Sequence, residues 1–375
     1  MRRLAVVVCI VGFVTLFGSK TSWTQPVETN DISNHQPGLC SQVPGFYVSY
    51  LFLSDGCELG GFSRMWFPAQ QPMHYVILDD AEYSLAFSFG KHPTTLGKLL
   101  LFDFNKPKHG VRQLHILGYL DRGRFSPHGL NIWIDIKHNL IYIFVVNHNA
   151  NTKETVEKFL FDAKRRRLYH VRTYDDPAFI HLADIVATGK ESFYFINFFR
   201  YDLNWEVHRS LRVGNVGFYD GRRGRTVLTG LGIPTGIMTS SDGRYVYMAE
   251  LGAETLNIYA RKTDYALSLV QEVPLNSFVD KIDVDVATGD VWVAGHGDIE
   301  FLLDDFGPPK NTSVSPSQVF RLSMSDGGST MIGVEDVYYN DGTEFSGSTV
   351  AVHYRRHVLI GSIDTKMLLC EVRHA

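Results

Sequence analysis

Asp242-Gly243-Arg244-Tyr245-Val246-Tyr247 shows the unit that decides the fold of this 375-residue chain. A polar turn is followed at once by a short strand of aromatic and β-branched residues. The same pattern recurs in Glu82–Phe87, His138–Ile143, Glu191–Ile196, Thr288–Val293 and Arg355–Ile360. The repeats begin roughly every 45 to 65 residues, which is near the period of propeller blades.

These repeats predict an all-β fold, a six-bladed β-propeller. A β-sandwich with additional hairpins is the alternative. Each propeller blade packs only against its neighbours, so we expect residues 40–375 to form one domain. The apolar content of 45 % is enough for a large core, and the net charge of −4 argues against a nucleic-acid partner.

Residues 1–20 read as a secretory targeting segment. Arg2 and Arg3 precede the apolar run Leu4–Gly18, as in the n-region and h-region of a signal. No convincing cleavage site of small residues follows, so we expect a retained N-terminal hydrophobic helix, with a cleaved signal peptide as the alternative. A retained helix predicts a single-pass protein of the endoplasmic reticulum or plasma membrane with a lumenal or extracellular propeller. Residues 21–39 would be a stalk.

The chain has four cysteines, and Cys9 lies in the apolar run. The remaining three, Cys40, Cys57 and Cys370, leave one unpaired or bonded to another chain. We expect Cys40 and Cys370, at the two ends of the domain, to form a disulfide that closes the ring, and Cys57 to be the odd one. In the chain-entropy account such a bond contributes about 4–5 kcal/mol. Asn311 begins the acceptor sequon Asn-Thr-Ser and predicts a glycan.

Four motifs carry chemistry-bearing residues. They are Ser126-Pro127-His128-Gly129-Leu130, Phe144-Val145-Val146-Asn147-His148, Ala183-Asp184-Ile185-Val186 and Val279-Asp280-Lys281-Ile282-Asp283-Val284-Asp285. Together with the segment from Gly347 to Cys370, they resemble the paraoxonase/arylesterase family over about residues 40–372. The resemblance implies a propeller with a buried catalytic calcium at its centre.

The resemblance also gives roles to three histidines. His128 matches the histidine beside the family's calcium, often proposed as the general base, and His148 matches its second-shell partner. His296, in Val-Ala-Gly-His-Gly, resembles a histidine at the rim of the active site. Imidazole titrates near neutral pH, so a base and shuttle pair of histidines is chemically reasonable.

The positions that match the family's calcium ligands are partly replaced. Glu58 matches the ligand glutamate, and Asp280 keeps the ligand aspartate. Ala183, Thr235 and Lys281 stand where the family has asparagines. Calcium takes six to eight oxygen ligands, so this set predicts a degraded site with weak or lost calcium.

An ammonium group cannot ligate calcium and repels it. We therefore hypothesise that Lys281 occupies the ion position and neutralises Asp280, with Glu58 as a second candidate. The alternative is that Lys281 points outward and a distorted calcium site persists. Asp184 matches a ligand of the family's second, structural calcium, where we expect weak or absent binding.

Three functions are considered from this resemblance. The degraded ligand set and the expected anchor are similar to the nematode paraoxonase-like membrane proteins that assist degenerin/epithelial sodium channels. This predicts a chaperone or accessory subunit with a membrane channel as partner. The alternative is a calcium-dependent arylesterase or lactonase in which His128 and His148 activate water. A propeller that binds a small lipid or lactone without turnover is the third reading.

Overall fold

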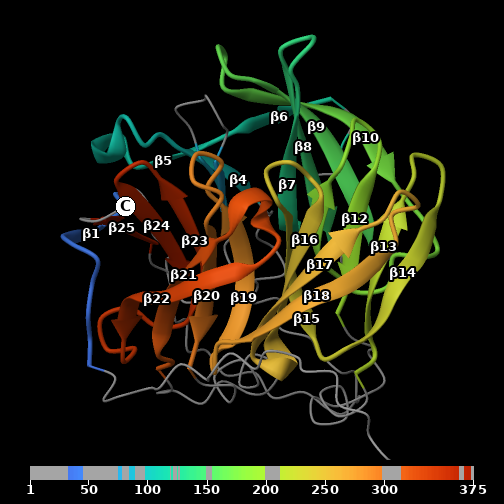
Figure 1. The fold of residues 1–375 in the computed structure, drawn as a ribbon. Helices are drawn as coiled ribbons and strands as arrows, with labels where there is room; N and C mark the ends of the chain where they lie inside the picture. Colours follow the sequence, from blue (N-terminus) through green and yellow to red (C-terminus); the bar gives the residue numbers. More distant parts are fainter. Residues whose placement is uncertain are drawn as a thin grey trace, which may run out of the picture.

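The computed structural model describes residues 33–44, 75–77, 84–88, 98–118, 120, 125, 127–148, 154–198, 212–297, 314–362 and 367–372. Within these residues the chain is built from strands in almost entirely antiparallel sheets that surround a common centre (Figure 1). An all-β propeller is therefore confirmed.

Five sheets are complete blades, each written here from its innermost strand outward. They are β7 (Pro127–Asp135), β8 (Leu140–Asn147), β9 (Thr155–Asp162), β10 (Arg167–Tyr174) and β6 (His115–Leu117); β11 (Leu182–Ala187), β12 (Phe193–Asn197), β13 (Gly214–Tyr219) and β14 (Gly224–Leu231); β15 (Pro234–Thr239), β16 (Tyr245–Glu250), β17 (Thr255–Arg261) and β18 (Leu267–Pro274); β19 (Phe278–Val284), β20 (Val291–His296), β21 (Ser317–Met324) and β22 (Met331–Asn340); and β23 (Ser348–Tyr354), β24 (His357–Ser362), β25 (Met367–Glu371) and β1 (Cys40–Gln42).

The prediction of six blades is corrected to five complete blades. The segment expected to supply the remaining blade forms a small sheet of β2 (Tyr75–Ile77), β3 (Ser84–Ser88), β4 (Lys98–Phe102) and β5 (Val111–Gln113). Its strands are only three or five residues long. A repeat in the sequence records one strand and says nothing of the length of its partners, and this explains the error.

The predicted N-terminal hydrophobic helix falls on residues 1–20, outside the described residues. The helical turns of the described part are short 3-10 segments: η1 (Pro107–His109), η3 (Leu251–Ala253) and η4 (Asp326–Gly328). None of the helices in this part is long and apolar enough to cross a membrane. Several strands, such as β12 and β20, are short apolar runs that are buried along their whole length, which is typical of strands covered on both faces.

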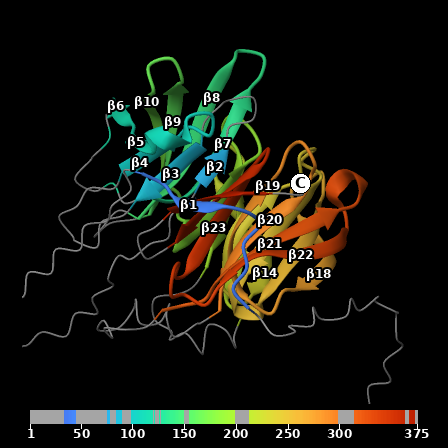
Figure 2. The same ribbon diagram turned by 90° about the vertical axis from the view of Figure 1, so that its left-hand side faces the viewer.

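The predicted disulfide between Cys40 and Cys370 is present. The two cysteines lie directly opposite each other in the antiparallel pair β1–β25. The bond therefore joins the first and last described strands within one sheet, rather than joining two blades. Figure 2 shows β1, in blue, near the small sheet, and the backbone N–H of Val111 donates to the carbonyl oxygen of Pro44 there.

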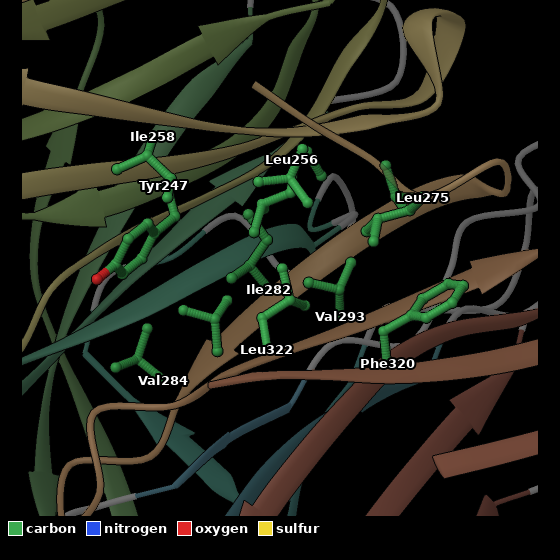
Figure 3. Packing of buried hydrophobic residues seen from close by; sticks show 13 residues of the cluster. Tyr247, Leu256, Ile258, Leu275, Ile282, Val284, Val293, Phe320 and Leu322 are labelled. Carbon is green, nitrogen blue, oxygen red and sulfur yellow. The ribbon is translucent and has the colours of Figure 1, made fainter. Parts of the chain in front are cut away.

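The apolar core lies between neighbouring sheets. One cluster packs Tyr247, Leu256 and Ile258 of the β15–β18 sheet against Ile282 and Leu322 of the β19–β22 sheet (Figure 3). All of these side chains are nearly or fully buried. Burial of apolar surface from both faces holds each blade in place and leaves the centre to the inner strands.

Candidate functional site

Neighbouring inner strands bring most of the predicted site residues to one end of the propeller. Each of these residues lies near the start of its strand: His128 in β7, Ala183 and Asp184 in β11, Thr235 in β15, and Asp280 and Lys281 in β19. The strands β7, β11, β15 and β19 contact one another in this order. His148 follows the end of β8, which returns antiparallel to β7, and so lies at the same end.

All five inner strands share one backbone irregularity near their starts. Strand pairing shifts register between Pro127 and Leu130, between Leu182 and Ile185, between Pro234 and Gly236, between Val279 and Ile282, and between Ser348 and Val350. A bulge of this kind turns a side chain away from the regular alternation of the strand. Repeated bulges on the inner strands therefore aim polar side chains at the propeller centre.

Two glycines allow the inner strands to approach closely. A Cβ atom at Gly129 would lie 2.5 Å from Oδ1 of Asp184, and one at Gly236 would collide with the carbonyl oxygen of Asp280. The glycine of the Ser-Pro-His-Gly motif is therefore required by packing against β11.

A chain of hydrogen bonds links His128 to a carboxylate that the sequence reasoning missed. Nε2 of His148 lies 2.9 Å from Nδ1 of His128, and Nδ1 of His148 lies 2.7 Å from Oε1 of Glu154. The carbonyl oxygen of Leu182 lies 3.3 Å from Nδ1 of His128. The other carboxylate oxygen of Glu154 accepts a hydrogen bond from the backbone N–H of Leu182. The structure thus places His128 and His148 within hydrogen-bond distance of each other, and their catalytic role stays a prediction.

Burial and charge set the protonation of this chain. Burial lowers the pKa of His128 well below 6.5, and the charges of Lys281 and His148 lower it further. His128 is therefore neutral at pH 7 and has the form that a base needs. Burial raises the pKa of Glu154, but the charge and hydrogen bond of His148 outweigh burial and hold the pKa below 4.5. Glu154 is therefore ionised.

Lys281 points inward, toward the positions where the resemblance placed calcium ligands. Its Nζ donates to the carbonyl oxygen of Ala183 at 3.3 Å and to the carbonyl oxygen of Thr235. It lies 3.6 Å from Oδ1 of Asp280, and both side chains are almost fully buried. The hydroxyl of Thr235 donates to the carbonyl oxygen of Val279 at 3.0 Å. One ammonium group thus lies among the backbone and side-chain oxygens of three blades.

The described part of this centre does not fit a calcium ion. Calcium needs six to eight oxygen ligands, whereas the oxygens of Ala183, Thr235 and Asp280 face a positive charge. Among the described residues, no group of three or more His, Cys, Asp or Glu side chains is arranged to hold a metal. Glu58, the remaining predicted ligand, lies outside them.

Asp184 is held by the backbone of two blades. Its oxygens accept hydrogen bonds from the N–H of Ile185 at 3.0 Å and of Ile237 at 3.2 Å. Burial raises its pKa to about 6, although the charge of Lys281 pulls the pKa down. Burial likewise raises the pKa of Asp280, against the charge of Lys281. Asp184 thus braces β11 against β15, a structural role that needs no ion.

His296, predicted at the site rim, ends β20 and is fully buried. Its Nδ1 lies 3.1 Å from the carbonyl oxygen of Ser348. His296 pairs with Phe278 at the start of β19, and its charge lowers the pKa of Asp280, so it lies at the same end of the propeller. Asn311, the predicted glycan site, and Cys57 fall outside the described residues.

The fold and the site define a class of protein, a β-propeller in which a buried His128 is hydrogen-bonded to His148 at the centre of one end. The Arylesterase family profile matches residues 85–372. The chain belongs to the paraoxonase/arylesterase family.

Relatives in this family are similar over most of their length. Serum paraoxonase/arylesterase 1 of Homo sapiens is 36 % identical over 288 residues, which cover 75 % of this chain and 78 % of the relative. The protein of the same name from Rattus norvegicus is 35 % identical over 287 residues, with the same coverage. Serum paraoxonase/lactonase 3 of Homo sapiens is 34 % identical over 284 residues, again covering 75 % and 78 %.

Proposed function

We propose that this chain hydrolyses carboxylic esters, with aryl esters and lactones as the substrate classes. Membership of the arylesterase family and the names of the relatives, arylesterase and lactonase, support this proposal. The observation that carries it is the hydrogen-bonded chain from Glu154 through His148 to His128.

His128 would act as the base that activates water. A water proton passes to the imidazole, the water oxygen bonds to the carbonyl carbon, and the bond to the leaving oxygen then breaks as that oxygen takes the proton back. Because its pKa is low, His128 is unprotonated at neutral pH and can accept the proton. Lys281 carries a positive charge into the same centre, which is the sign that favours the developing negative charge on the ester oxygen.

Lys281 would also replace the calcium on which the family generally depends. We expect calcium binding to be weak or lost, because its position is filled by an ammonium group hydrogen-bonded to Ala183 and Thr235. Removing the cation and restoring oxygen donors should therefore restore a metal site.

Calcium titration by calorimetry tests this replacement. The purified wild-type protein should bind no calcium at micromolar concentration, whereas Lys281→Asn combined with Ala183→Asn and Thr235→Asn should bind it. Lys190→Asn, on the turn before β12, is the matched control and should remain without binding. Tight binding by the wild type would contradict the replacement.

A second function is favoured by the same lysine. The ammonium group of Lys281 is engaged by two carbonyl oxygens and the carboxylate of Asp280, which leaves little of its capacity for a substrate. Such a site fits a non-catalytic accessory protein or chaperone of the secretory pathway with a membrane channel subunit as partner. Co-precipitation of a channel subunit by the full chain, without ester hydrolysis, would favour this function over the first.

A further inference from the structure

Glu154 is ionised and can only accept hydrogen bonds, which determines the protons along the histidine chain. Nδ1 of His148, at 2.7 Å from Glu154, must therefore carry a proton. The carbonyl oxygen of Leu182 lies beside Nδ1 of His128 and only accepts, so the hydrogen between the two histidines comes from His128, and Nε2 of His148 is the acceptor. It faces Nδ1 of His128 at 2.9 Å, which must be the donor.

The same contact with Leu182 places the proton of His128. Nδ1 of His128 also lies 3.3 Å from the carbonyl oxygen of Leu182, and a carbonyl oxygen only accepts. Two acceptors around Nδ1 of His128 place its proton there. The nitrogen that can take a proton from water is then Nε2.

Glu154 also fixes the backbone beside His128. Its second oxygen accepts from the N–H of Leu182, the residue whose carbonyl oxygen lies beside His128. Leu182 begins β11 at the bulge that carries Ala183 and Asp184. One carboxylate thus orients His148 and ties the neighbouring blade to the histidine pair.

From this geometry we propose that Glu154 is a positioning residue for the base, acting through His148 to hold His128 in the tautomer with its proton on Nδ1. The inference rests on the proposed ester hydrolysis for its catalytic consequence. When His128 accepts a proton, the carboxylate of Glu154 stabilises the positive charge that the two imidazoles then share.

Glu154→Gln tests the inference in the full chain. The Leu182 N–H needs the amide oxygen, so the amide NH₂ faces Nδ1 of His148 and requires that nitrogen to accept. His148 then donates from Nε2, and the proton of His128 moves to its own Nε2. We expect kcat for phenyl acetate to fall about 100-fold, with KM changed less than about twofold, because a wrong tautomer removes most of the base catalysis.

Glu157→Gln is the matched control, because Glu157 lies three residues further along the chain and holds a different histidine, His170, at 2.8 Å. It should lower the stability of the protein and leave kcat and its pH profile unchanged. Glu154→Asp should recover part of the lost kcat, since it restores an acceptor.

The tautomers are read directly by ¹⁵N NMR of labelled histidine, with His128→Gln and His148→Gln to assign the signals. We expect protons on Nδ1 of both histidines in the wild type and on Nε2 of both in Glu154→Gln. Unchanged tautomers in Glu154→Gln would overturn the inference whatever the activity. A wild type without turnover that still shows the tautomer change would overturn the proposed hydrolysis and leave the positioning of His128 standing.

Discussion

Two glutamate–histidine pairs lie close together in the same blade and have different surroundings. Glu154, just before β9, holds His148 at 2.7 Å, and Glu157, within β9, holds His170 at 2.8 Å. Both carboxylates are buried. By residue type, distance and burial the two pairs are almost the same.

The difference lies in what each pair contacts next. Glu157 accepts further hydrogen bonds from Thr155, Thr173 and Asn147, all within its own sheet. Its hydrogen bonds therefore close within one blade. The Glu154 pair continues to His128 on β7 and to Leu182 in the neighbouring blade. A buried carboxylate–histidine pair therefore does not mark a site by itself. What distinguishes the Glu154 pair is its continuation to a second histidine at the propeller centre.

The largest expected effect separates the histidines of the two regions. His128→Gln should lower ester hydrolysis by about 10²- to 10⁴-fold, because it removes the base. His170→Gln should change the rate of the folded protein less than about twofold. Initial rates with phenyl acetate and a lactone, normalised to folded protein, measure both. Equal losses in the two variants would remove the distinction between the pairs.

The second expected effect is on stability, and here the larger loss is expected at Glu157 and not at Glu154. Glu157→Ala leaves four donors without their acceptor and should lower the free energy of unfolding by about 3–5 kcal/mol. Glu154→Ala removes the acceptor of His148 and of the N–H of Leu182 and should cost about 1–3 kcal/mol. Urea unfolding with the disulfide intact compares them. A larger cost at Glu154 would indicate that its role is mainly structural.

The smallest effect is a difference in acid stability. The pKa of Glu154 is lower in the folded chain than its ordinary 4.5, so its contribution to stability is present above pH 4.5. It is lost as pH falls through the folded pKa, because the folded state then takes up a proton that the unfolded state has already bound. Between pH 5 and 3 the wild type should therefore lose more stability than Glu154→Gln. Urea unfolding of both proteins at each pH measures this. An equal loss of unfolding free energy between pH 5 and 3 in the wild type and in Glu154→Gln would contradict the prediction.

Local patterns predicted much of the fold. The strands at Asp242–Tyr247 and Glu191–Ile196 were found because a polar turn followed by aromatic and β-branched residues is a local signal. Cys40 and Cys370 were paired because they lie at the two ends of the domain. The number of complete blades was wrong, because the pattern near Glu82–Phe87 records one strand and not its partners.

The site was predicted in part. His128 and His148 were recognised from their motifs, whereas Glu154 was missed because its contact with Leu182 spans 28 positions. A usable signal was present in the hairpin of β8 and β9. Asn147 pairs with Thr155 there, so the next positions, His148 and Glu154, face each other. The bulges on the inner strands are set by packing between blades, which no local pattern records.

Hydrolysis of phenyl acetate by the purified full chain, measured with and without a calcium chelator, tests the central claim most directly. If Lys281 replaces calcium and His128 is the base, the rate should be the same with and without chelator and should be lost in His128→Gln. A rate that disappears on chelation, or that survives His128→Gln, would contradict the account.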